Sequence, residues 1–293
     1  MNLRQLEYLD ALAGEGSFGR AAARCSASQP AVSVAIAKLE AELGVELVRR
    51  ESRGAVLTPP GEALVRWARQ ALAGVDGLKV EATRFAGALN GRVTLGVIPT
   101  ALPAVARITR GLISAHPGIH LEIRSLSSDS IVDELAAFRI DAGLTYLDNE
   151  PVGAVTTTPI YTERYVLLTT ERRSGNSVRW SDLDGSSLCL LTPDMQNRRI
   201  IDDALDRNGA IVTAVVETDS ISALISYVRA GWPSIVSDAW VELYGVPEGM
   251  KALPLVAPQI THSVGLVTRI TELTPPLVRA LTESVAAHAG GLA

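Results

Sequence analysis

The residues near the N-terminus that are best suited to binding another molecule are short polar side chains followed by arginines. Gln29 and Ser33 are four residues apart, so they lie one turn apart on the same side of a helix. Glutamine can form two hydrogen bonds with an adenine edge, and Pro30 or Ala31 can contact a thymine methyl group. Three arginines that could bind phosphates or a minor groove follow in a predicted turn: Arg49, Arg50 and Arg53. The pattern predicts an interface for double-stranded DNA, and the alternatives are a helix cap and a solvated turn.

Other kinds of chemistry have little support in the sequence. The histidines lack the spacing of zinc ligands, and no cysteine pair accompanies them: His116, His120, His262 and His288. No glycine-rich phosphate loop follows a predicted strand, and no serine or cysteine lies in a nucleophile elbow. We therefore expect no metal, no cofactor and no enzymatic activity.

The chain has two cysteines, Cys25 and Cys189, which cannot form a disulfide framework, so a cytoplasmic protein is the default expectation. Cys189 lies in a predicted core strand, where a buried and inert thiol is expected. A peroxide sensor would need a second cysteine nearby in the same domain, and this chain has none. The sequence leaves open whether either cysteine has a redox role.

Length and composition indicate a globular protein of two domains that does not cross a membrane. The chain has 293 residues, of which 47% are hydrophobic and 20% are charged. No apolar run reaches the ~20 residues that a membrane-spanning helix needs. Residues 1–92 contain 12 Lys/Arg and 10 Asp/Glu, whereas the remainder has a net charge of -7. A DNA-binding surface must therefore come from the local placement of arginines in the N-terminal part.

Three short helices and a hairpin are expected to hold the N-terminal polar groups in place. Leucines at every third residue predict a first helix that ends at a pair of glycines. Ser17 is expected to cap a second helix over residues 18–24, and Ser28 to cap a third with Pro30 in its first turn. Apolar residues spaced by 4, 3 and 4 line the third helix: Val32, Ile36, Leu39 and Leu43. Residues 45–57 predict a small two-stranded wing.

A single long helix is expected over residues 60–90. Its apolar residues are spaced alternately by 4 and 3, as in a heptad seam: Leu64, Ala68, Ala71, Val75, Leu78, Ala82, Phe85 and Leu89. Such a helix would extend ~45 Å, too far to fold back on the preceding head. We expect the seam to join two copies of the chain through Leu64, Ala71, Val75, Leu78 and Phe85. The alternative is an amphipathic helix that lies on its own domain.

From Arg92 onward the pattern changes to alternating strands and helices. Strands are expected at residues 93–98, 121–126, 142–146, 165–169, 187–191, 212–217, 234–237 and 263–268. Helices are expected at residues 102–115, 130–138, 198–208, 221–230 and 276–288. This alternation predicts parallel sheets covered by helices, in two small lobes with a ligand cleft at the carboxyl ends of the strands.

Several segments resemble LysR-type transcriptional regulators. In the head they are residues 17–22, 28–33, 39–44 and 47–61, and in the α/β part they are residues 92–97 and 116–121. The resemblance covers the whole chain, densely at the front and loosely at the back. It implies an α/β protein with an all-α, winged-helix head: a winged helix-turn-helix, a long linker helix and a two-lobed effector domain similar to periplasmic solute-binding proteins of type 2.

The resemblance also implies domain boundaries. The winged helix-turn-helix DNA-binding domain would occupy residues 1–58, the dimerisation helix residues 59–90, and the effector domain residues 91–293. Within the effector domain, the first lobe would comprise residues 91–160 and 266–293, and the second lobe residues 161–265. The two lobes would then be joined near residues 160 and 265.

The function implied by the resemblance is that of a DNA-binding transcription regulator. Such a protein binds an inverted-repeat operator in double-stranded DNA as a dimer or tetramer, acts with RNA polymerase and responds to a small-molecule effector. The implied DNA contacts are Ser17, Ser28, Gln29, Pro30, Ala31, Ser33, Arg49, Arg50 and Arg53. Val34 and Ala35 stand where many members of the family have polar or basic residues, so we expect more reliance on backbone contacts and DNA shape.

Loops that follow predicted strands are expected to line the effector cleft: Pro99, Thr100, Ser127, Ser128, Tyr146, Gln196, Asn197 and Arg198. Hydroxyls and backbone amides at helix starts bind a carboxylate or a similar anion well. Residues 126–135, 198–202 and 217–224 are similar to the branch that contains the cyanate-operon regulator, which favours a small effector and makes an anion a candidate. Trp232 is expected to pack against the hinge between the lobes.

The alternative function is a solute-binding or catalytic α/β protein whose head binds another protein. Salt-dependent binding to duplex DNA would separate the two functions, because counterion release accompanies DNA binding and not a protein-only contact. The sequence does not identify the effector, the operator or the sign of regulation.

Overall fold

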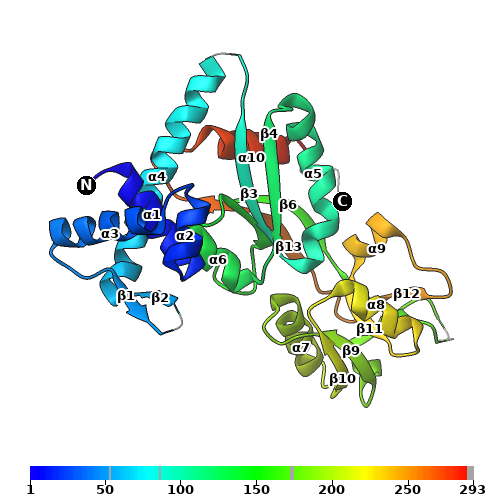
Figure 1. Ribbon diagram of the computed structural model, residues 1–293. Coiled ribbons are helices and arrows are strands. Elements are labelled where there is room, and N and C mark those ends of the chain that lie inside the picture. The colour runs from blue at the N-terminus through cyan, green and yellow to red at the C-terminus, as the bar shows by residue number, and fades with distance from the viewer. Residues whose placement is uncertain (53, 86, 172–174, 289–293) are drawn as a thin grey trace. The chain divides into compact units, whose positions relative to one another are not determined.

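The computed structural model divides into two compact units. The head unit comprises residues 1–88 with residues 136–139, and the effector unit comprises the rest of the described chain. The described residues, shown in Figure 1, are 1–52, 54–85, 87–171 and 175–288.

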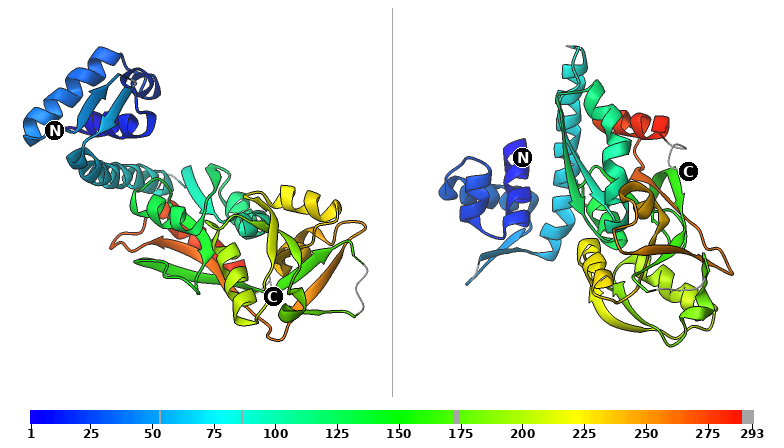
Figure 2. Two further views of the ribbon diagram at one scale, coloured as in Figure 1. Left: turned by 90° about the horizontal axis from the view of Figure 1, so that it is seen from below. Right: turned by 90° about the vertical axis from the view of Figure 1, so that its right-hand side faces the viewer.

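The head unit begins with three helices and a hairpin, whose strands project from the helices in Figure 2. Their bounds are α1 Leu3–Glu15, α2 Phe18–Arg24, α3 Gln29–Leu43, β1 Val48–Glu51 and β2 Gly54–Leu57. Strands β1 and β2 are antiparallel. Leu9, Ile36 and Leu39 are among the buried residues that pack the helices together. The predicted winged helix-turn-helix is therefore confirmed, and the predicted contact residue Arg53 lies outside the described residues.

Local hydrogen bonds explain where the helices of the head begin and end. The Ser28 hydroxyl accepts a hydrogen bond from the Ala31 amide at 3.3 Å and caps α3, as the sequence predicts. Gly16 ends α1 in the left-handed region, at a φ of 59°. The predicted side-chain cap at Ser17 is wrong, because only its backbone takes part, with its carbonyl accepting from the Ala21 amide at 2.9 Å.

Helix α4 (Pro59–Phe85) has its first turns packed against α1. Ala68 is buried there in the core of the head. Gly61 is needed at this approach, because a Cβ atom would lie 2.1 Å from the Leu47 carbonyl oxygen. Leu89, the last residue of the predicted seam, lies beyond α4 and is buried in the effector unit. The predicted seam is therefore too long at its C-terminal end.

The first lobe of the effector unit is a five-stranded sheet in the order β4-β3-β5-β13-β6. The strands are β3 Gly91–Val97, β4 Ile119–Ser125, β5 Ala142–Tyr146, β6 Val155–Glu163 and β13 His262–Arg269. The helices are α5 Leu102–Ala115, preceded by the short 3₁₀ helix η1 Pro99–Ala101, α6 Ser128–Ala136 and α10 Pro276–His288. Strand β3 is parallel to β4 and β5, but β13 is antiparallel to β5 and β6. The prediction of purely parallel sheets is wrong, because β13 re-enters this sheet in the opposite direction after the second lobe.

The second lobe contains a mixed sheet in the order β11-β7-β12-β8 and a parallel pair of strands, β9 and β10. The strands are β7 Tyr165–Thr169, β8 Val178–Arg179, β9 Ser187–Leu191, β10 Thr213–Thr218, β11 Ser234–Ser237 and β12 Lys251–Val256. The helices are η2 Trp180–Leu183, α7 Gln196–Arg207, α8 Ile221–Arg229 and α9 Asp238–Tyr244. Sequence patterns missed β6 and β12, since each contains a proline, Pro159 or Pro254, which argues against a strand. They also missed the two-residue strand β8 and the short helix α9.

A glycine in the first-lobe sheet lets α6 approach it closely. At Gly143 in β5, a Cβ atom would lie 2.3 Å from the Cγ2 atom of Ile131 in α6. Ile131 and Leu135 are buried on this side of α6. The close packing fixes the first turn of α6, where Ser128 lies, directly after β4.

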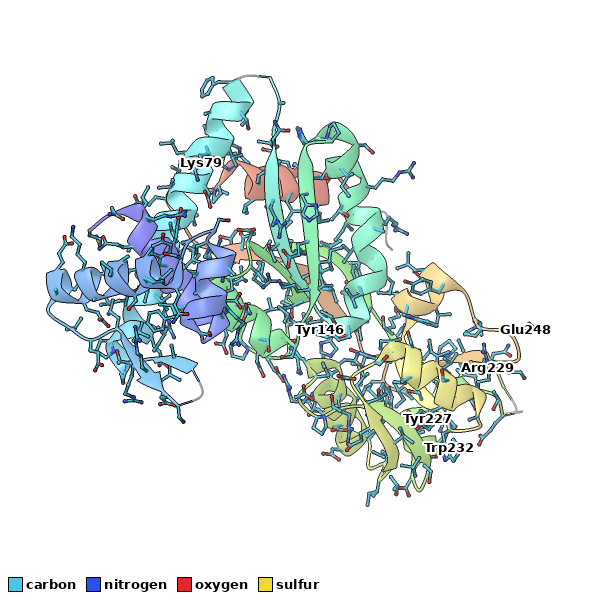
Figure 3. The ribbon with its side chains drawn as sticks, viewed as in Figure 1. Lys79, Tyr146, Tyr227, Arg229, Trp232 and Glu248 are labelled. Atoms are coloured by element: carbon cyan, nitrogen blue, oxygen red, sulfur yellow. The ribbon has the colours of Figure 1, made fainter. Side chains whose placement is uncertain are left out.

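The two lobes are joined at Arg164, between β6 and β7, and at residues 257–261, between β12 and β13. Trp180 packs beside these connections: its ring centre is 6.1 Å from that of Tyr165, and its Nε1 donates to the Pro258 carbonyl at 3.1 Å. The expectation that Trp232 packs against the hinge is wrong. Trp232 is 41% exposed just after α8 and packs edge-on against Tyr227, on the outer part of the second lobe (Figure 3).

Helix α4 has 27 residues. Neither it nor any other helix in the described ranges is long and apolar enough to cross a membrane.

Candidate DNA interface and effector pocket

The outward face of α3 contains the residues that the sequence predicts to read DNA. Gln29, Pro30 and Ala31 are exposed in its first turn, directly after the capping Ser28. Val34 lies one turn further along this face and is 69% exposed. Glutamine can bond an adenine edge, and exposed apolar groups can contact a thymine methyl. The face therefore offers one base-reading amide surrounded by small or apolar contacts.

Arg50 of the wing contacts side chains of α2 and α3 instead of extending freely into solvent. Its guanidinium donates a 2.6 Å hydrogen bond to the Ser33 hydroxyl and lies 4.6 Å from the centre of the Phe18 ring. The Arg49 side chain is 61% exposed, and its ionic partner among the described residues is Glu51 at 3.5 Å. The structure thus brings Ser33 and Arg50 together, and it leaves Arg49 available for a phosphate.

Helix α4 has an exposed apolar stripe beyond the head core. Of the eight predicted seam residues, six are exposed or half-buried: Leu64, Ala71, Val75, Leu78, Ala82 and Phe85. Leu78 and Phe85 are 73% and 80% exposed. Leu64 is half-buried, because one side of it packs against the core of its own head. Trp67, which the sequence reasoning missed, is 68% exposed. It lies four residues before Ala71, which is one of the spacings that occur in a heptad seam. We call Trp67, Ala71, Leu78 and Phe85 the α4 stripe.

Two small cavities lie between the lobes of the effector unit and share Thr100, Leu191 and Asn197 as lining residues. Each has a volume of about 10 Å³, which is room for about one water molecule. We call the one beside α6 the effector pocket, and seven of its lining residues are among those that the sequence predicts: Pro99, Thr100, Ser127, Ser128, Tyr146, Gln196 and Asn197. Three helix starts meet there, those of η1, α6 and α7.

Two neighbouring serines at the start of α6 have different roles. The Ser127 hydroxyl accepts from the Ser130 amide at 3.3 Å and donates to the Ser130 hydroxyl at 2.9 Å, so it caps the helix. The Ser128 side chain is 6% exposed, and its hydroxyl has no hydrogen-bond partner among the described residues. A buried hydroxyl without a partner is costly unless another group satisfies it. Ser128 therefore marks the pocket as a place for a polar ligand.

Arg198, the remaining predicted effector residue, does not line the pocket. Its guanidinium is held within the second lobe by Asp202 at 2.8 Å, Glu217 at 2.7 Å and the Leu191 carbonyl at 2.7 Å. The prediction that Arg198 adds charge to the cleft is wrong, because these partners use its donors elsewhere.

Its neighbour Arg199 instead crosses between the lobes. The Arg199 guanidinium binds both carboxylate oxygens of Glu150 at 2.7 Å, from Nε and from Nη2. Beside it, the Gln196 amide donates to the Asp148 carbonyl at 3.2 Å. A bidentate pair of this kind is a strong, directional contact, so it holds the start of α7 against the first lobe.

Tyr146 is the centre of a buried hydrogen-bond network at the pocket. Its hydroxyl accepts from the Asn197 amide nitrogen at 2.9 Å, lies 3.4 Å from the Thr100 hydroxyl and donates to Glu163. Figure 3 shows the labelled Tyr146 where the first lobe meets the second. Because Tyr146 and Thr100 come from the first lobe and Asn197 from the second, this network links the two lobes across the pocket.

Glu163 is a fully buried carboxyl group at the junction of β6 and β7. Besides Tyr146, its partners are the Ser237 hydroxyl at 2.7 Å and the Tyr165 hydroxyl at 3.5 Å. Burial raises the pKa of Glu163 to about 7, and its hydroxyl partners oppose this rise. A carboxyl group inside the protein is therefore able to change its charge near neutral pH.

Neither cysteine has the surroundings of a reactive thiol. Cys189 is fully buried in β9, and burial raises its pKa. Cys25 lies in the head, where burial also raises the pKa of its thiol. In the described part of the chain, no three His, Cys, Asp or Glu side chains gather so as to hold a metal ion.

Four residues that shape these sites were missed by sequence reasoning: Trp67, Glu163, Arg199 and Ser237. Glu163 carried a signal that could have found it. Residues 155–170 contain only two charged side chains, Glu163 and the adjacent Arg164, and an acidic side chain is unusual in a core strand. Trp67 had the right spacing but was assigned no role. Arg199 and Ser237 depend on contacts between segments far apart in the chain, which no local pattern indicates.

Fold and site together define a winged helix-turn-helix regulator with a two-lobed ligand-binding domain. Residues 3–62 match the bacterial regulatory helix-turn-helix proteins of the LysR family, and residues 86–290 match the LysR substrate binding domain. The chain belongs to the LysR family of DNA-binding transcription regulators that respond to an effector. The alternative of an α/β protein with a protein-binding head is not favoured.

Relatives are similar over nearly their whole length. The DNA-binding transcriptional dual regulator OxyR of Escherichia coli is 30% identical, with 99% of this chain and 97% of OxyR covered. A hydrogen peroxide-inducible genes activator of Haemophilus influenzae is 29% identical, with 92% of this chain and 91% of the relative covered. The solved structure of a full-length OxyR variant from Pseudomonas aeruginosa is 28% identical, with a TM-score of 0.79 and coverage of 97% of this chain and 94% of the other.

Proposed function

We propose that this regulator binds a small anionic effector in the pocket beside α6, and that this ligand parts the lobes and thereby alters DNA binding by the head. The observation that carries the proposal is Ser128, a residue that lines the pocket and whose buried hydroxyl has no partner among the described residues. A ligand that accepts a hydrogen bond there would remove the cost of leaving this hydroxyl unpaired.

The lining favours a negative charge over a positive one. No carboxylate lines the pocket among the described residues. Its polar lining consists of hydroxyl and amide groups, and the Ser128 hydroxyl has a hydrogen that no described residue accepts. The starts of η1, α6 and α7 add backbone N–H groups and the positive ends of helix dipoles. No arginine or lysine lines it either, so the fit is to a small, singly charged anion such as a carboxylate.

Entry of such a ligand requires movement, because a volume of about 10 Å³ holds only about one water molecule. The contacts that must break lie between the lobes, namely Asn197 with Tyr146 and Arg199 with Glu150. A ligand shifts the balance between closed and open lobes by its different affinity for the two states. Effector binding is therefore coupled to lobe opening.

The names of the relatives raise hydrogen peroxide as a second candidate effector. Thiol chemistry in this chain gives it no support, because Cys189 is the one cysteine outside the head and its pKa is raised by burial. The effector unit has no second cysteine with which Cys189 could form a disulfide. We therefore infer that the effector acts by non-covalent binding.

For the head, we infer that a dimer binds an inverted repeat in double-stranded DNA in the cytoplasm, and that the α4 stripe joins the two copies. Gln29, Pro30, Ala31 and Val34 would face the major groove, with Arg49 at a phosphate. Contact with RNA polymerase, and assembly of dimers into tetramers, follow as further expectations.

The test of the effector site uses acetate and acetamide, which have nearly the same shape but differ in charge. Thermal unfolding of the full chain is followed with each additive, and sodium chloride is the control for ionic strength. We expect acetate alone to raise the melting temperature, and Ser128→Ala to remove most of that rise. Ser226→Ala, at an exposed helical serine, is the matched control and keeps the rise. Equal effects of acetate and acetamide, or an unchanged response in Ser128→Ala, would contradict the proposal.

A further inference from the structure

The buried carboxyl group of Glu163 reaches the effector pocket only through other hydroxyls. Glu163 does not line the pocket, but it accepts a hydrogen bond from Tyr146, whose hydroxyl lies 3.4 Å from that of Thr100. Thr100 lines both cavities between the lobes. A continuous chain of polar atoms therefore runs from Glu163 through Tyr146 to the ligand position.

The Tyr146 hydroxyl has a single hydrogen, so it can donate in only one direction at a time. The Asn197 amide nitrogen donates to it at 2.9 Å while the lobes are closed. This contact breaks when the lobes part, so it does not set the direction of the Tyr146 hydrogen. When Glu163 is ionised, the Tyr146 hydrogen points to the carboxylate, and Thr100 can join the chain only by donating to Tyr146. Thr100 then offers a lone pair to the pocket, which is unfavourable for an anion.

The direction of the hydrogen bonds between Glu163, Tyr146 and Thr100 reverses when Glu163 carries a proton. The carboxylic acid then donates to the Tyr146 oxygen, the Tyr146 hydrogen turns to Thr100, and the Thr100 hydrogen becomes free to bond a ligand. Ser237 continues to donate to the other Glu163 oxygen at 2.7 Å in both states. The two states differ only in one proton and two rotated hydroxyls, so neither requires the backbone to move.

We propose that Glu163 controls, through Tyr146 and Thr100, whether the pocket offers a hydroxyl hydrogen to its ligand, so that an anionic effector is bound together with one proton. The inference rests on the proposed function, since it concerns the same pocket and the same class of ligand. Glu163 is a positioning residue here, because it acts on the ligand through two other side chains.

The charges around Glu163 favour proton uptake on anion binding. Burial is the main cause of its raised pKa of about 7, and the negative charge of Asp238 adds to it. A further negative charge in the pocket would act in the same direction. The other titratable groups that face this site from neighbouring strands are Tyr146, Tyr161, Tyr165, His262 and, through His262, Asp148.

The test measures the affinity of the full chain for acetate between pH 6 and pH 8.5, where acetate stays ionised. Nuclear magnetic resonance titrations give the apparent Kd at each pH. We expect the Kd to be constant below the pKa of Glu163 and to rise by up to about tenfold per pH unit above it. Glu163→Gln, which has no proton to lose and keeps a donor, should bind at every pH as the parent chain does near pH 6. Glu122→Gln, at a carboxylate on β4 that pairs with Arg124, should retain the parent's pH profile.

A second variant separates the hydrogen-bond chain from simple charge repulsion. Tyr146→Phe leaves Glu163 in place but removes the link to Thr100, so the pH dependence of acetate affinity should fall to less than about threefold over the same range. Repulsion alone would preserve the full profile in this variant. Thr100→Val and Thr100→Ser test the same hydrogen-bond chain at its pocket end. Valine removes the hydroxyl and should abolish the pH dependence, whereas serine keeps the hydroxyl and should retain it. This pair of variants answers the question even if Tyr146→Phe lowers the stability of the protein.

The outcomes distinguish this inference from the proposed function. Acetate binding that is independent of pH in the parent chain, or a full pH profile in both Tyr146→Phe and Thr100→Val, overturns the proton link and leaves the anion site standing. Absence of acetate binding at every pH in the parent and in Glu163→Gln overturns the anion site, and the proton link with it.

Discussion

The head and the effector unit hold their functional groups in opposite ways. In the head, an apolar core of residues such as Leu9, Ile36 and Leu39 supports an exposed face on which Gln29 and Val34 point outward. In the effector unit, Thr100, Ser128, Tyr146 and Asn197 are buried and meet from separate helices and strands. We therefore expect DNA binding to use a surface that is ready in the free protein, and effector binding to require the lobes to part.

The difference also concerns charge. Arg49 on the wing stays largely in solvent, where a charge costs little and can be paired with a phosphate when DNA arrives. Glu163 is fully removed from solvent, where an ionised carboxylate is costly unless hydrogen bonds compensate. We therefore expect surface charges of the head to set its affinity for a partner, and the buried carboxyl group of the effector unit to make its behaviour sensitive to pH.

The largest expected effect comes from the α4 stripe, which we propose joins two copies of the chain. Replacing Leu78 and Phe85 with aspartate puts two carboxylates into each α4 stripe, so the chain should become a monomer by light scattering. Operator affinity should fall ~10²–10⁴-fold, because the second head loses its high effective concentration. The operator can be a duplex that the parent chain selects from random DNA.

Asp76→Asn serves as the control for this pair, since Asp76 is exposed on α4 away from the stripe and pairs only with Lys79. It should keep both the mass and the operator affinity of the parent. A double aspartate variant with an unchanged mass would show that α4 does not join two copies.

A smaller effect is expected from the buried charge of the effector unit. The pKa of Glu163 is raised from 4.5 to about 7, so between these values the folded chain holds a proton that the unfolded chain has lost. Stability contributed by this group is therefore present at low pH and lost as pH rises through 7, by roughly 3 kcal/mol in total. Urea unfolding at pH 5 and pH 8 should show this loss in the parent and not in Glu163→Gln. A pH-independent difference between the two chains would mean that Glu163 does not titrate in this range.

The exposed face of α3 should give an effect of intermediate size that depends on DNA sequence. Gln29→Ala is expected to cost ~1–3 kcal/mol at the operator and almost nothing on random DNA, since only base reading is lost. Arg49→Ala should weaken both and lower the slope of log K against log salt by about one, since it removes one phosphate contact. Equal losses of Gln29→Ala on operator and random DNA would show that Gln29 does not read bases.

The same contrast explains what could be predicted from the sequence. The head was predictable almost to the residue, because capping, helix period and an exposed polar face are all local patterns. Residues 18–24 and 29–43, for example, form helices where serine and apolar spacing indicate them. The local pattern did not show that Leu64 packs partly against its own head, since an apolar position alone does not tell which partner will cover it.

In the effector unit, the strands with uninterrupted apolar runs were predictable, such as residues 142–146, 165–169 and 234–237. The rule that ligands bind beyond the carboxyl ends of strands indicated loops that meet in the structure, since seven of the eight expected residues line one pocket. The antiparallel return of β13 and the partners of Arg198 and Glu163 were not predictable. They depend on contacts between residues far apart in the sequence. Glu163 and Ser237, for example, are 74 positions apart and form a hydrogen bond.

The smallest expected effect distinguishes two adjacent serines and so tests how the pocket is built. Ser127 caps α6 with both its lone pair and its hydrogen, whereas the Ser128 hydroxyl has no partner among the described residues. Ser127→Ala should therefore lower the unfolding free energy by ~1 kcal/mol while the chain keeps its stabilisation by acetate. Ser128→Ala should leave the unfolding free energy nearly unchanged, because it removes a hydroxyl that has no partner. It should abolish the stabilisation by acetate, because it takes a hydrogen-bond donor away from the ligand. Urea unfolding with and without acetate measures both quantities in each variant. If Ser127→Ala loses the acetate response as completely as Ser128→Ala, the ligand depends on the whole first turn of α6 and not on the hydroxyl of Ser128.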